Sequence, residues 1–181
     1  MSRRPSRHSR GFTLIEAIAT MVVLGVMGAF ISGLIVRVAN QYSATAVAGR
    51  LQGQLSTAME RVFRELQSIP ARAGASPVVA EISAVTASSV TFRTNWVLSL
   101  VDGQLLLAES GATAQPLLDD VIAFSVQALD AQGAALAASL SGAACDAVNR
   151  FSVTIAVTRA GVTETLRTRV FIRALQSGAS G

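Results

Sequence analysis

A single carboxylate interrupts the long apolar run near the start of the chain. Glu16 is the only charged residue between Phe12 and Val36, and the twenty residues 17–36 carry no charge. Twenty helical residues measure about 30 Å, which matches the hydrocarbon core of a bilayer. An acid in a membrane span costs about 2.5–3.5 kcal/mol at its centre and less near an interface. Glu16 therefore needs a cationic partner, which its own span lacks, unless it reaches back to the lipid headgroups.

The residues around Glu16 follow a specific order. Residues 10–16 read RGFTLIE, so a basic leader ends at Gly11, an aromatic residue follows, and the glutamate comes four residues after the aromatic one. A helix dipole also favours an anion this close to the start of a helix. This order resembles the processing motif of type IV prepilins and of type II secretion pseudopilins. The motif combines a basic leader, a glycine, an aromatic residue, a glutamate at the right spacing and a long apolar run. The close resemblance covers residues 10–36.

The resemblance implies a processing site and an assembly site. In that family a membrane peptidase cuts after the glycine and the new N-terminal residue is N-methylated, which here implies a cut between Gly11 and Phe12 and a methyl group on Phe12. The assembly glutamate of the family corresponds to Glu16, and a neighbouring subunit's Phe12 α-amino group would supply its cation. The motif is completed by Thr13, Leu14 and Ile15. The implied partners are the prepilin peptidase/methyltransferase, other pilins or pseudopilins, and the inner membrane.

The arginine-rich leader predicts the orientation of the chain. The leader holds four of the 15 basic residues, so its removal leaves 11 arginines against 11 acids and nothing that predicts a nucleic-acid partner. Arginines ahead of a span keep the N-terminus in the bacterial cytoplasm and send the C-terminal part to the periplasm. Two alternatives compete with processing at Gly11. One is a secretory signal cut near Ala44-Thr45-Ala46, and the other is an uncut signal anchor that holds a periplasmic binding domain.

The mature chain lacks the residues that most catalytic sites need. Its only histidine, His8, lies in the leader, and the chain has no lysine. This excludes nucleophilic catalytic sites of the Ser-His-Asp, Cys-His and Ser-Lys types. It also excludes metal sites with histidine ligands. Asp119 and Asp120 are neighbours in a predicted strand, where adjacent side chains point to opposite faces, so they form no carboxylate dyad. The single cysteine, Cys145, has no partner for an internal disulfide, and we expect it to be buried and inert. The sequence predicts no enzyme, cofactor or metal.

One long helix must carry the motif. Beyond the span, apolar residues recur at steps of three and four, at Leu51, Leu55, Met59, Val62, Leu66 and Ile69. This spacing predicts that the helix continues from about Thr13 to Ser68, and Pro70 ends it. The expected segments are a cleaved leader (1–11), a transmembrane or filament-core helix (12–36), an amphipathic second half of the helix (37–69), a linker (70–77), a periplasmic sheet domain (78–175) and a polar tail (176–181).

The C-terminal part has the patterns of β-strands. Strand patterns cover residues 78–85, 89–100, 104–109 and 117–129, Asp102-Gly103 marks a hairpin turn, and residues 130–149 read as a long loop. Residues 151–157 alternate between apolar and polar and return after a turn at 159–161, with Arg167, Arg169 and Arg173 on the solvated face. We expect an α+β fold in which an antiparallel sheet of four to six strands lies across the second half of the helix, as the pilin resemblance also implies.

These features together predict a structural subunit of a type II secretion pseudopilus or a type IV pilus. Residues 56–69 (STAMERVFRELQSI) and 116–124 (PLLDDVIAF) look most like J-type minor pseudopilins and related minor pilins. This second resemblance implies a minor component and not the bulk subunit of the fibre. The expected mechanism is mechanical, because the apolar helix would leave the lipid to join the core of a filament.

Overall fold

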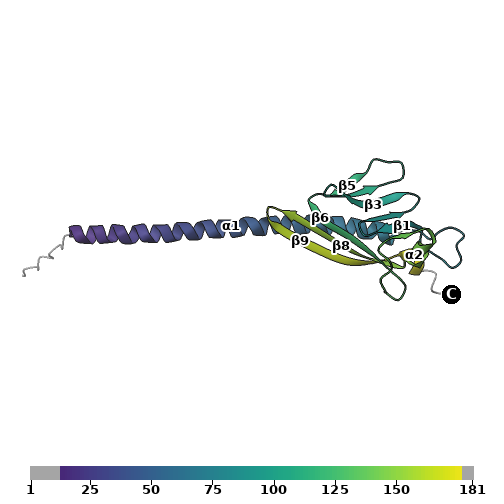
Figure 1. Ribbon diagram of the computed structural model, residues 1–181. Coiled ribbons are helices and arrows are strands. Elements are labelled where there is room, and N and C mark those ends of the chain that lie inside the picture. The colour runs from purple at the N-terminus through teal and green to yellow at the C-terminus, as the bar shows by residue number, and fades with distance from the viewer. Residues whose placement is uncertain (1–12, 177–181) are drawn as a thin grey trace, which may run out of the picture. The chain divides into compact units, whose positions relative to one another are not determined.

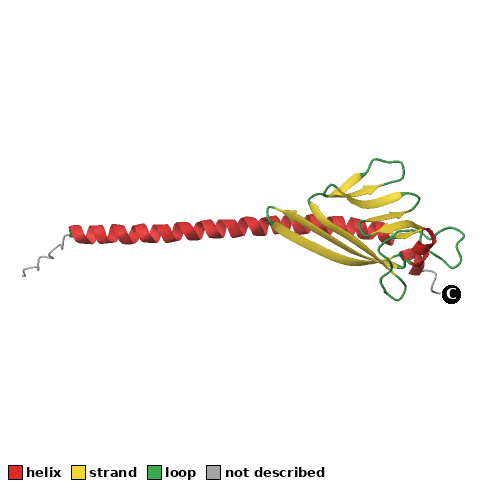
Figure 2. Cartoon of the chain, in the orientation of Figure 1, coloured by secondary structure: helices red, strands yellow, loops and turns green. Residues whose placement is uncertain are grey.

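The computed structural model describes residues 13–176, which form one long helix and two antiparallel sheets (Figures 1 and 2). Helix α1 (Leu14–Gln67) runs through two compact units, one ending at Ser43 and the other starting at Ala44. The long helix and the α+β fold predicted from the sequence are confirmed. Gly11 and Phe12 lie outside the described residues, as does most of the predicted tail.

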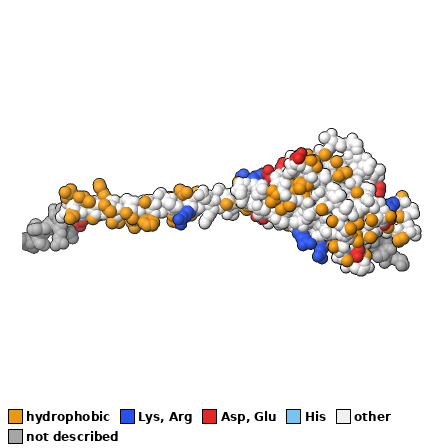
Figure 3. All heavy atoms as spheres, viewed as in Figure 1, with side chains coloured by type: hydrophobic (Ala, Val, Ile, Leu, Met, Phe, Trp, Pro, Cys, Tyr) orange, Lys and Arg blue, Asp and Glu red, His pale blue; other side chains and the backbone are white. Residues whose placement is uncertain are grey.

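In the first unit, residues 17–36 of the helix carry no charge on any side. Its large hydrophobic side chains from Leu14 to Val38 are 52–81% exposed, and Figure 3 shows them along this part of the helix. A globular surface helix normally confines its apolar residues to one stripe, whereas a helix that is apolar all round belongs inside a protein assembly or a membrane. This unit has the length and composition of a membrane span, and nothing in the described chain covers it.

In the second unit, the same helix carries one buried stripe. Leu51, Leu55, Met59, Val62 and Leu66 are at most 4% exposed, and their spacing places them on one face. The helix ends at Gln67, where the Ser68 hydroxyl donates to the carbonyl oxygens of Arg64 (2.7 Å) and Glu65 (3.1 Å). Pro70 follows two residues later and cannot continue the backbone hydrogen bonds of a helix.

Six strands form the larger sheet, in the order β5-β4-β3-β2-β1-β7, with every neighbouring pair antiparallel. Five of them follow one another as hairpins, and the sixth returns to pair with the first. Their bounds are β1 (Ile82–Thr86), β2 (Ser89–Phe92), β3 (Trp96–Val101), β4 (Gln104–Ala108), β5 (Gln115–Leu118) and β7 (Leu140–Ser141). The predicted turn at Asp102-Gly103 joins β3 to β4, and both residues have positive φ (48° and 75°), which suits a two-residue hairpin loop.

Three longer strands form the second sheet, in the order β6-β8-β9. Their bounds are β6 (Val121–Leu129), β8 (Arg150–Arg159) and β9 (Val162–Phe171), and the short helix α2 (Arg173–Gln176) follows. The predicted hairpin near the C-terminus is confirmed as the β8–β9 pair, whose register runs unbroken from Arg150↔Phe171 to Arg159↔Val162. Arg173 lies in α2, so the prediction that it shares a strand face with Arg167 and Arg169 was wrong.

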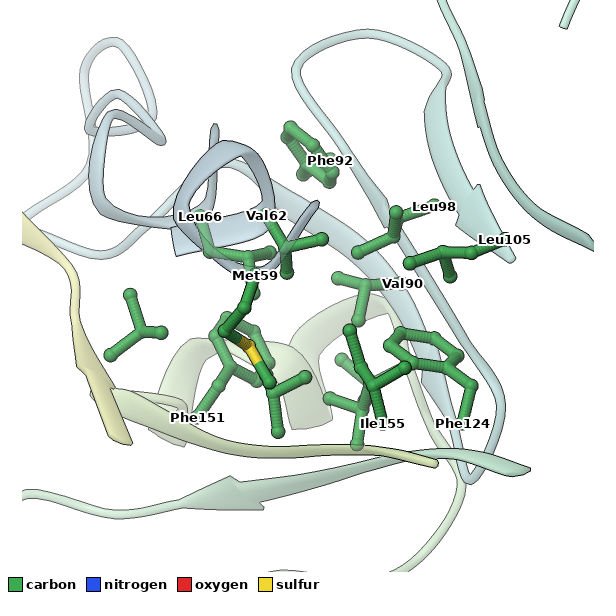
Figure 4. Close-up of a cluster of buried hydrophobic side chains, with 14 of the residues drawn as sticks. Met59, Val62, Leu66, Val90, Phe92, Leu98, Leu105, Phe124, Phe151 and Ile155 are labelled. Carbon is green, nitrogen blue, oxygen red and sulfur yellow. The ribbon is translucent and has the colours of Figure 1, made fainter. Parts of the chain in front are cut away.

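The core fills the space between the second half of α1 and the two sheets. Figure 4 shows Met59, Val62 and Leu66 of the helix pointing toward side chains of both sheets. The larger sheet contributes Val90, Phe92, Leu98 and Leu105, and the smaller sheet contributes Phe124, Phe151 and Ile155. Because all three layers share these contacts, the helix stripe is the surface on which both sheets are assembled.

The prediction of one sheet with four to six strands was wrong, because the predicted strand 117–129 is broken by a turn and its two parts, β5 and β6, belong to different sheets. The predicted strand 89–100 is also broken, into β2 and β3 of the same sheet. Residues 93–95 all have positive φ and separate β2 from β3, so that Phe92 and Trp96 become a cross-strand pair with ring centroids 6.3 Å apart. Asp120, also at positive φ, separates β5 from β6. Asn95 and Asp120 are of the residue types that tolerate this left-handed conformation, and no Gly or Pro marks either turn in the sequence.

The predicted loop at residues 130–149 contains ordered structure. Leu140 and Ser141 pair with β1, and the 3₁₀ helix η1 (Gly142–Ala147) follows them. Leu140 is 8% exposed and Cys145 is fully buried, so this stretch closes the core next to β1. A strand of two residues is too short to show a periodicity, and its partner lies more than fifty positions earlier in the chain. The local sequence therefore does not predict this pairing.

Arg93 ties the β2–β3 turn to the end of α1, and its loss is expected to destabilise the second unit. Its Nη1 lies 3.2 Å from Glu65 Oε2, its Nη2 donates to the Ser68 carbonyl (2.8 Å), and its guanidinium lies 5.1 Å from the Trp96 ring centroid. Arg93→Ala should lower the free energy of unfolding by about 2 kcal/mol, because charge-assisted hydrogen bonds and a cation–π contact are lost together. Denaturant unfolding followed by Trp96 fluorescence measures this difference.

The matched control is Arg64→Ala. Arg64 pairs with Glu60 on the same helix, but both side chains are mostly exposed (64% and 69%). Exposed pairs of this kind contribute at most about 0.5 kcal/mol. Equal losses of unfolding free energy in the two variants would show that the Arg93 contacts stabilise the fold no more than an exposed ion pair does.

Burial raises the pKa of the Cys145 thiol, with a further increase from Asp146 and an opposing decrease from Arg72. The folded protein therefore keeps the thiol proton at a pH where the unfolded chain releases it. Stability from this source is full below the ordinary thiol pKa and falls as the pH rises above it. We expect unfolding free energies to drop between pH 7 and pH 9.5 more steeply for the wild type than for Cys145→Ala. Parallel pH profiles of the two proteins would contradict this expectation.

Candidate functional site

The described part of the predicted site is the first turn of α1. Thr13 immediately precedes the helix, and Leu14, Ile15 and Glu16 form its first turn. The predicted cleavage residues Gly11 and Phe12 lie outside the described residues. The structure thus places four of the six predicted site residues together.

Thr13 and Glu16 bond to each other in both directions. The Glu16 backbone N–H donates to Thr13 Oγ1 (3.4 Å), while Glu16 Oε2 accepts from the Thr13 backbone N–H (3.5 Å) and hydroxyl (3.4 Å). This reciprocal pattern is a capping box, which satisfies N–H groups that the first turn of a helix would leave unpaired. The spacing Thr-x-x-Glu is its sequence signature.

The capping box fixes where the negative charge of Glu16 lies. The carboxylate is held beside the first N–H groups of α1, where the helix dipole stabilises an anion. Glu16 is nevertheless exposed, and within residues 13–176 no cationic side chain pairs with it. A cation supplied from outside the described residues can therefore approach the carboxylate.

The second unit has a groove of about 890 Å³. It lies between α1 and strand β5 and is lined by small helix residues, Gly49, Gly53 and Thr57, and by four arginines. Three of these arginines are held in ion pairs, namely Arg61–Glu65, Arg64–Glu60 and Arg159–Asp120. These ion pairs neutralise most of the positive charge of the groove.

The two adjacent aspartates lie in the turn between β5 and β6, so the prediction that they occupy a strand was wrong. Asp119 Oδ1 accepts from Gln104 Nε2 (2.8 Å), and Asp120 Oδ2 accepts from Arg159 Nε (2.7 Å). The two carboxylates have different partners, so they link the turn between β5 and β6 to β4 and to β8 separately. No group of three or more potential metal ligands occurs among the residues that the structure describes.

Comparison with known proteins identifies one matching region. Residues 6–32 match the family model of the prokaryotic N-terminal methylation motif. No curated protein and no solved structure matches the chain. The match spans the predicted cleavage site, the capping box and most of the apolar helix of the first unit. It supports membership in the prepilin and pseudopilin family, with a membrane-anchored, pilin-like architecture.

Proposed function

We propose that this protein is a structural subunit, and a minor one, of a type IV pilus or a type II secretion pseudopilus. The observation that carries the proposal is the coincidence of three features within residues 6–32. These are the match to the methylation motif, the capped start of α1 at Thr13, and an exposed apolar helix that follows without a break. The likeness of residues 56–69 and 116–124 to J-type minor subunits supports the minor role.

The proposed pathway starts in the inner membrane. A prepilin peptidase cuts between Gly11 and Phe12, and the new N-terminus of Phe12 is methylated. The leader arginines hold the N-terminus in the cytoplasm before the cut, and the sheet domain lies in the periplasm. Thr13, Leu14 and Ile15 then form the first residues of the mature helix together with Glu16.

Assembly joins the helices of neighbouring subunits. Glu16 pairs with the α-amino group of a neighbour's Phe12, which neutralises a carboxylate that would otherwise be costly in an apolar surrounding. The helix surface from Leu14 to Val38, which the described chain leaves exposed, becomes buried among other helices of the filament. Packing in such a core relies on close van der Waals contact and paired polar groups.

The proposal is tested by crosslinking in cells that contain a complete filament machinery. A photo-activated amino acid replaces Leu24, an exposed residue of the apolar helix. Light should join the protein to other pilin-like subunits, which mass spectrometry identifies. A protein that crosslinks only to lipid or to itself under conditions where a known pilin joins its neighbours would contradict the proposal.

A further inference from the structure

The two sheets present four edges within the described residues, and three of them are protected. Strand β5 has only four residues and contains Pro116, and β7 has only two residues. The outer edge of β6 is hydrogen-bonded, since Val126 N–H donates to the Ala87 carbonyl and Leu136 N–H donates to the Ala128 carbonyl, both at 2.9 Å. Short length, proline and covering loops are the usual means by which proteins prevent other strands from adding to a sheet.

The fourth edge, β9, has none of these protections. It is ten residues long, contains no proline, and pairs with β8 in an unbroken register on one side only. Among residues 13–176, no backbone group pairs with β9 from the other side. Figure 1 shows β9 as the outer strand of its sheet.

The turn that precedes β9 determines which of its backbone groups are free. Ala160 and Gly161 form a two-residue loop with φ of 50° and 78°, which is typical of a type I′ hairpin. In such a hairpin the flanking residues, Arg159 and Val162, form a hydrogen-bonded pair. The N–H and C=O groups of every second residue from Thr163 to Phe171 therefore point away from β8. These groups form a regular ladder that has no backbone partner among residues 13–176.

The inner face of β9 also leaves part of the core uncovered. Leu166 and Thr168 are only half-buried, although Ile155 and Val153, their cross-strand partners on β8, are fully buried. At these two pairs burial decreases from β8 to β9, whereas Val170, near the end of the same face, is fully buried. An additional strand beyond β9 would further cover Leu166 and Thr168 and would satisfy the free backbone groups.

The charges on β9 indicate what kind of strand fits. Its outward face carries Arg167 and Arg169, both exposed, and pairing with β9 of a second copy would gather four guanidinium groups on one face. Like charges that face each other across strands are unfavourable, whereas opposite charges stabilise the pair. Glu164 of β9 is the only acid within a described strand, so no other described strand of a second copy could offer acids.

We propose that the free edge of β9 binds an extended segment of a different protein by strand addition, with acidic side chains of that segment opposite Arg167 and Arg169. Backbone hydrogen bonds supply affinity in this mode of recognition, and alternate side chains supply specificity. This interaction is separate from filament assembly through the N-terminal helix.

The test uses the full chain in detergent and a fluorescent nine-residue peptide in which glutamate alternates with valine. The peptide should bind saturably, and the same peptide with lysine in place of glutamate should bind at least tenfold more weakly. A third peptide keeps the glutamates but carries N-methyl groups at alternate residues, which removes the N–H groups needed for pairing. It should also lose at least tenfold in affinity. Equal binding of the methylated and unmethylated glutamate peptides would show that charge alone attracts them and would overturn the proposal.

Substitutions in β9 test the same interaction by changing the protein and not the peptide. Thr165→Pro removes an N–H that points to the free edge, where proline is tolerated, and Thr165→Val keeps it. The proline variant should bind the glutamate peptide at least tenfold more weakly than the valine variant. Arg167→Glu combined with Arg169→Glu should reverse the preference so that the lysine peptide binds better. If the reversed charges leave the preference unchanged, β9 is not the binding edge.

Discussion

Replacing Glu16 by glutamine is expected to stop entry of the subunit into a filament while leaving the leader cleavable. Glutamine keeps a side-chain oxygen that can accept from Thr13, so the capping box is retained, but it cannot neutralise a neighbour's α-amino group. An unpaired charge inside an apolar assembly costs several kcal/mol, and each 1.4 kcal/mol is a factor of ten. Crosslinks from position 24 should fall at least about tenfold relative to the wild-type chain.

The capping function of Glu16 is separated from its charge by a second substitution. Thr13→Val removes the hydroxyl that caps the Glu16 N–H but keeps the carboxylate. Loss of a cap costs about 1 kcal/mol of helix stability, so crosslinking should decrease far less than in Glu16→Gln. If Thr13→Val abolishes the crosslinks and Glu16→Gln leaves them unchanged, the carboxylate matters only as part of the cap.

Truncation of Phe151 is expected to have the largest effect on the stability of the second unit. This side chain is fully buried, and Figure 4 shows it between the helix residue Met59 and the smaller sheet. Phe151→Ala should lower the free energy of unfolding by about 3–5 kcal/mol, because apolar contacts are lost and a cavity remains. A domain of ordinary stability would then be close to unfolding. Denaturant titration read from Trp96, the only tryptophan, measures the change.

Two controls define this effect. Phe151→Leu keeps most of the buried volume and should cost less than half as much. Ile122→Ala truncates a side chain that is 55% exposed on β6 and should change the free energy of unfolding by about 0.5 kcal/mol or less. If Phe151→Ala lowered the free energy of unfolding no more than Ile122→Ala does, this would contradict the burial of Phe151 in a core shared by the helix and the sheets.

The sequence predicted the elements whose periodicity is long and regular. Leu51, Leu55, Met59, Val62 and Leu66 repeat over more than four helical turns, and β8 alternates over its whole length, so both were found correctly. The division into two sheets was not predictable in this way. It depends on the turn at Asp120, between β5 of the larger sheet and β6 of the smaller sheet, where no glycine or proline marks the change of direction. Pairing between β7 and β1 depends on tertiary contacts that no local pattern contains.

The candidate site was predictable to a different degree at each residue. Glu16 stood out as a charge in an apolar run, and its reciprocal bonds with Thr13 could have been read from the Thr-x-x-Glu spacing. The proposed cation for Glu16 belongs to another subunit, so neither the sequence nor a single folded chain contains it. The free edge of β9 could not be predicted either, because the strand order of the sheet decides which strand lies at an edge, and the sequence does not give that order.

The most direct test of processing at Gly11 is the mass of the protein after co-expression with a prepilin peptidase. The wild-type chain is analysed beside Gly11→Val, which removes the glycine that the motif places before the cut. We predict a species that begins at Phe12 and is heavier by one methyl group, and that is absent from the variant. A wild-type chain that keeps residues 1–11, under conditions where a known prepilin is cut, would contradict the account and would make the protein an uncut, membrane-anchored domain.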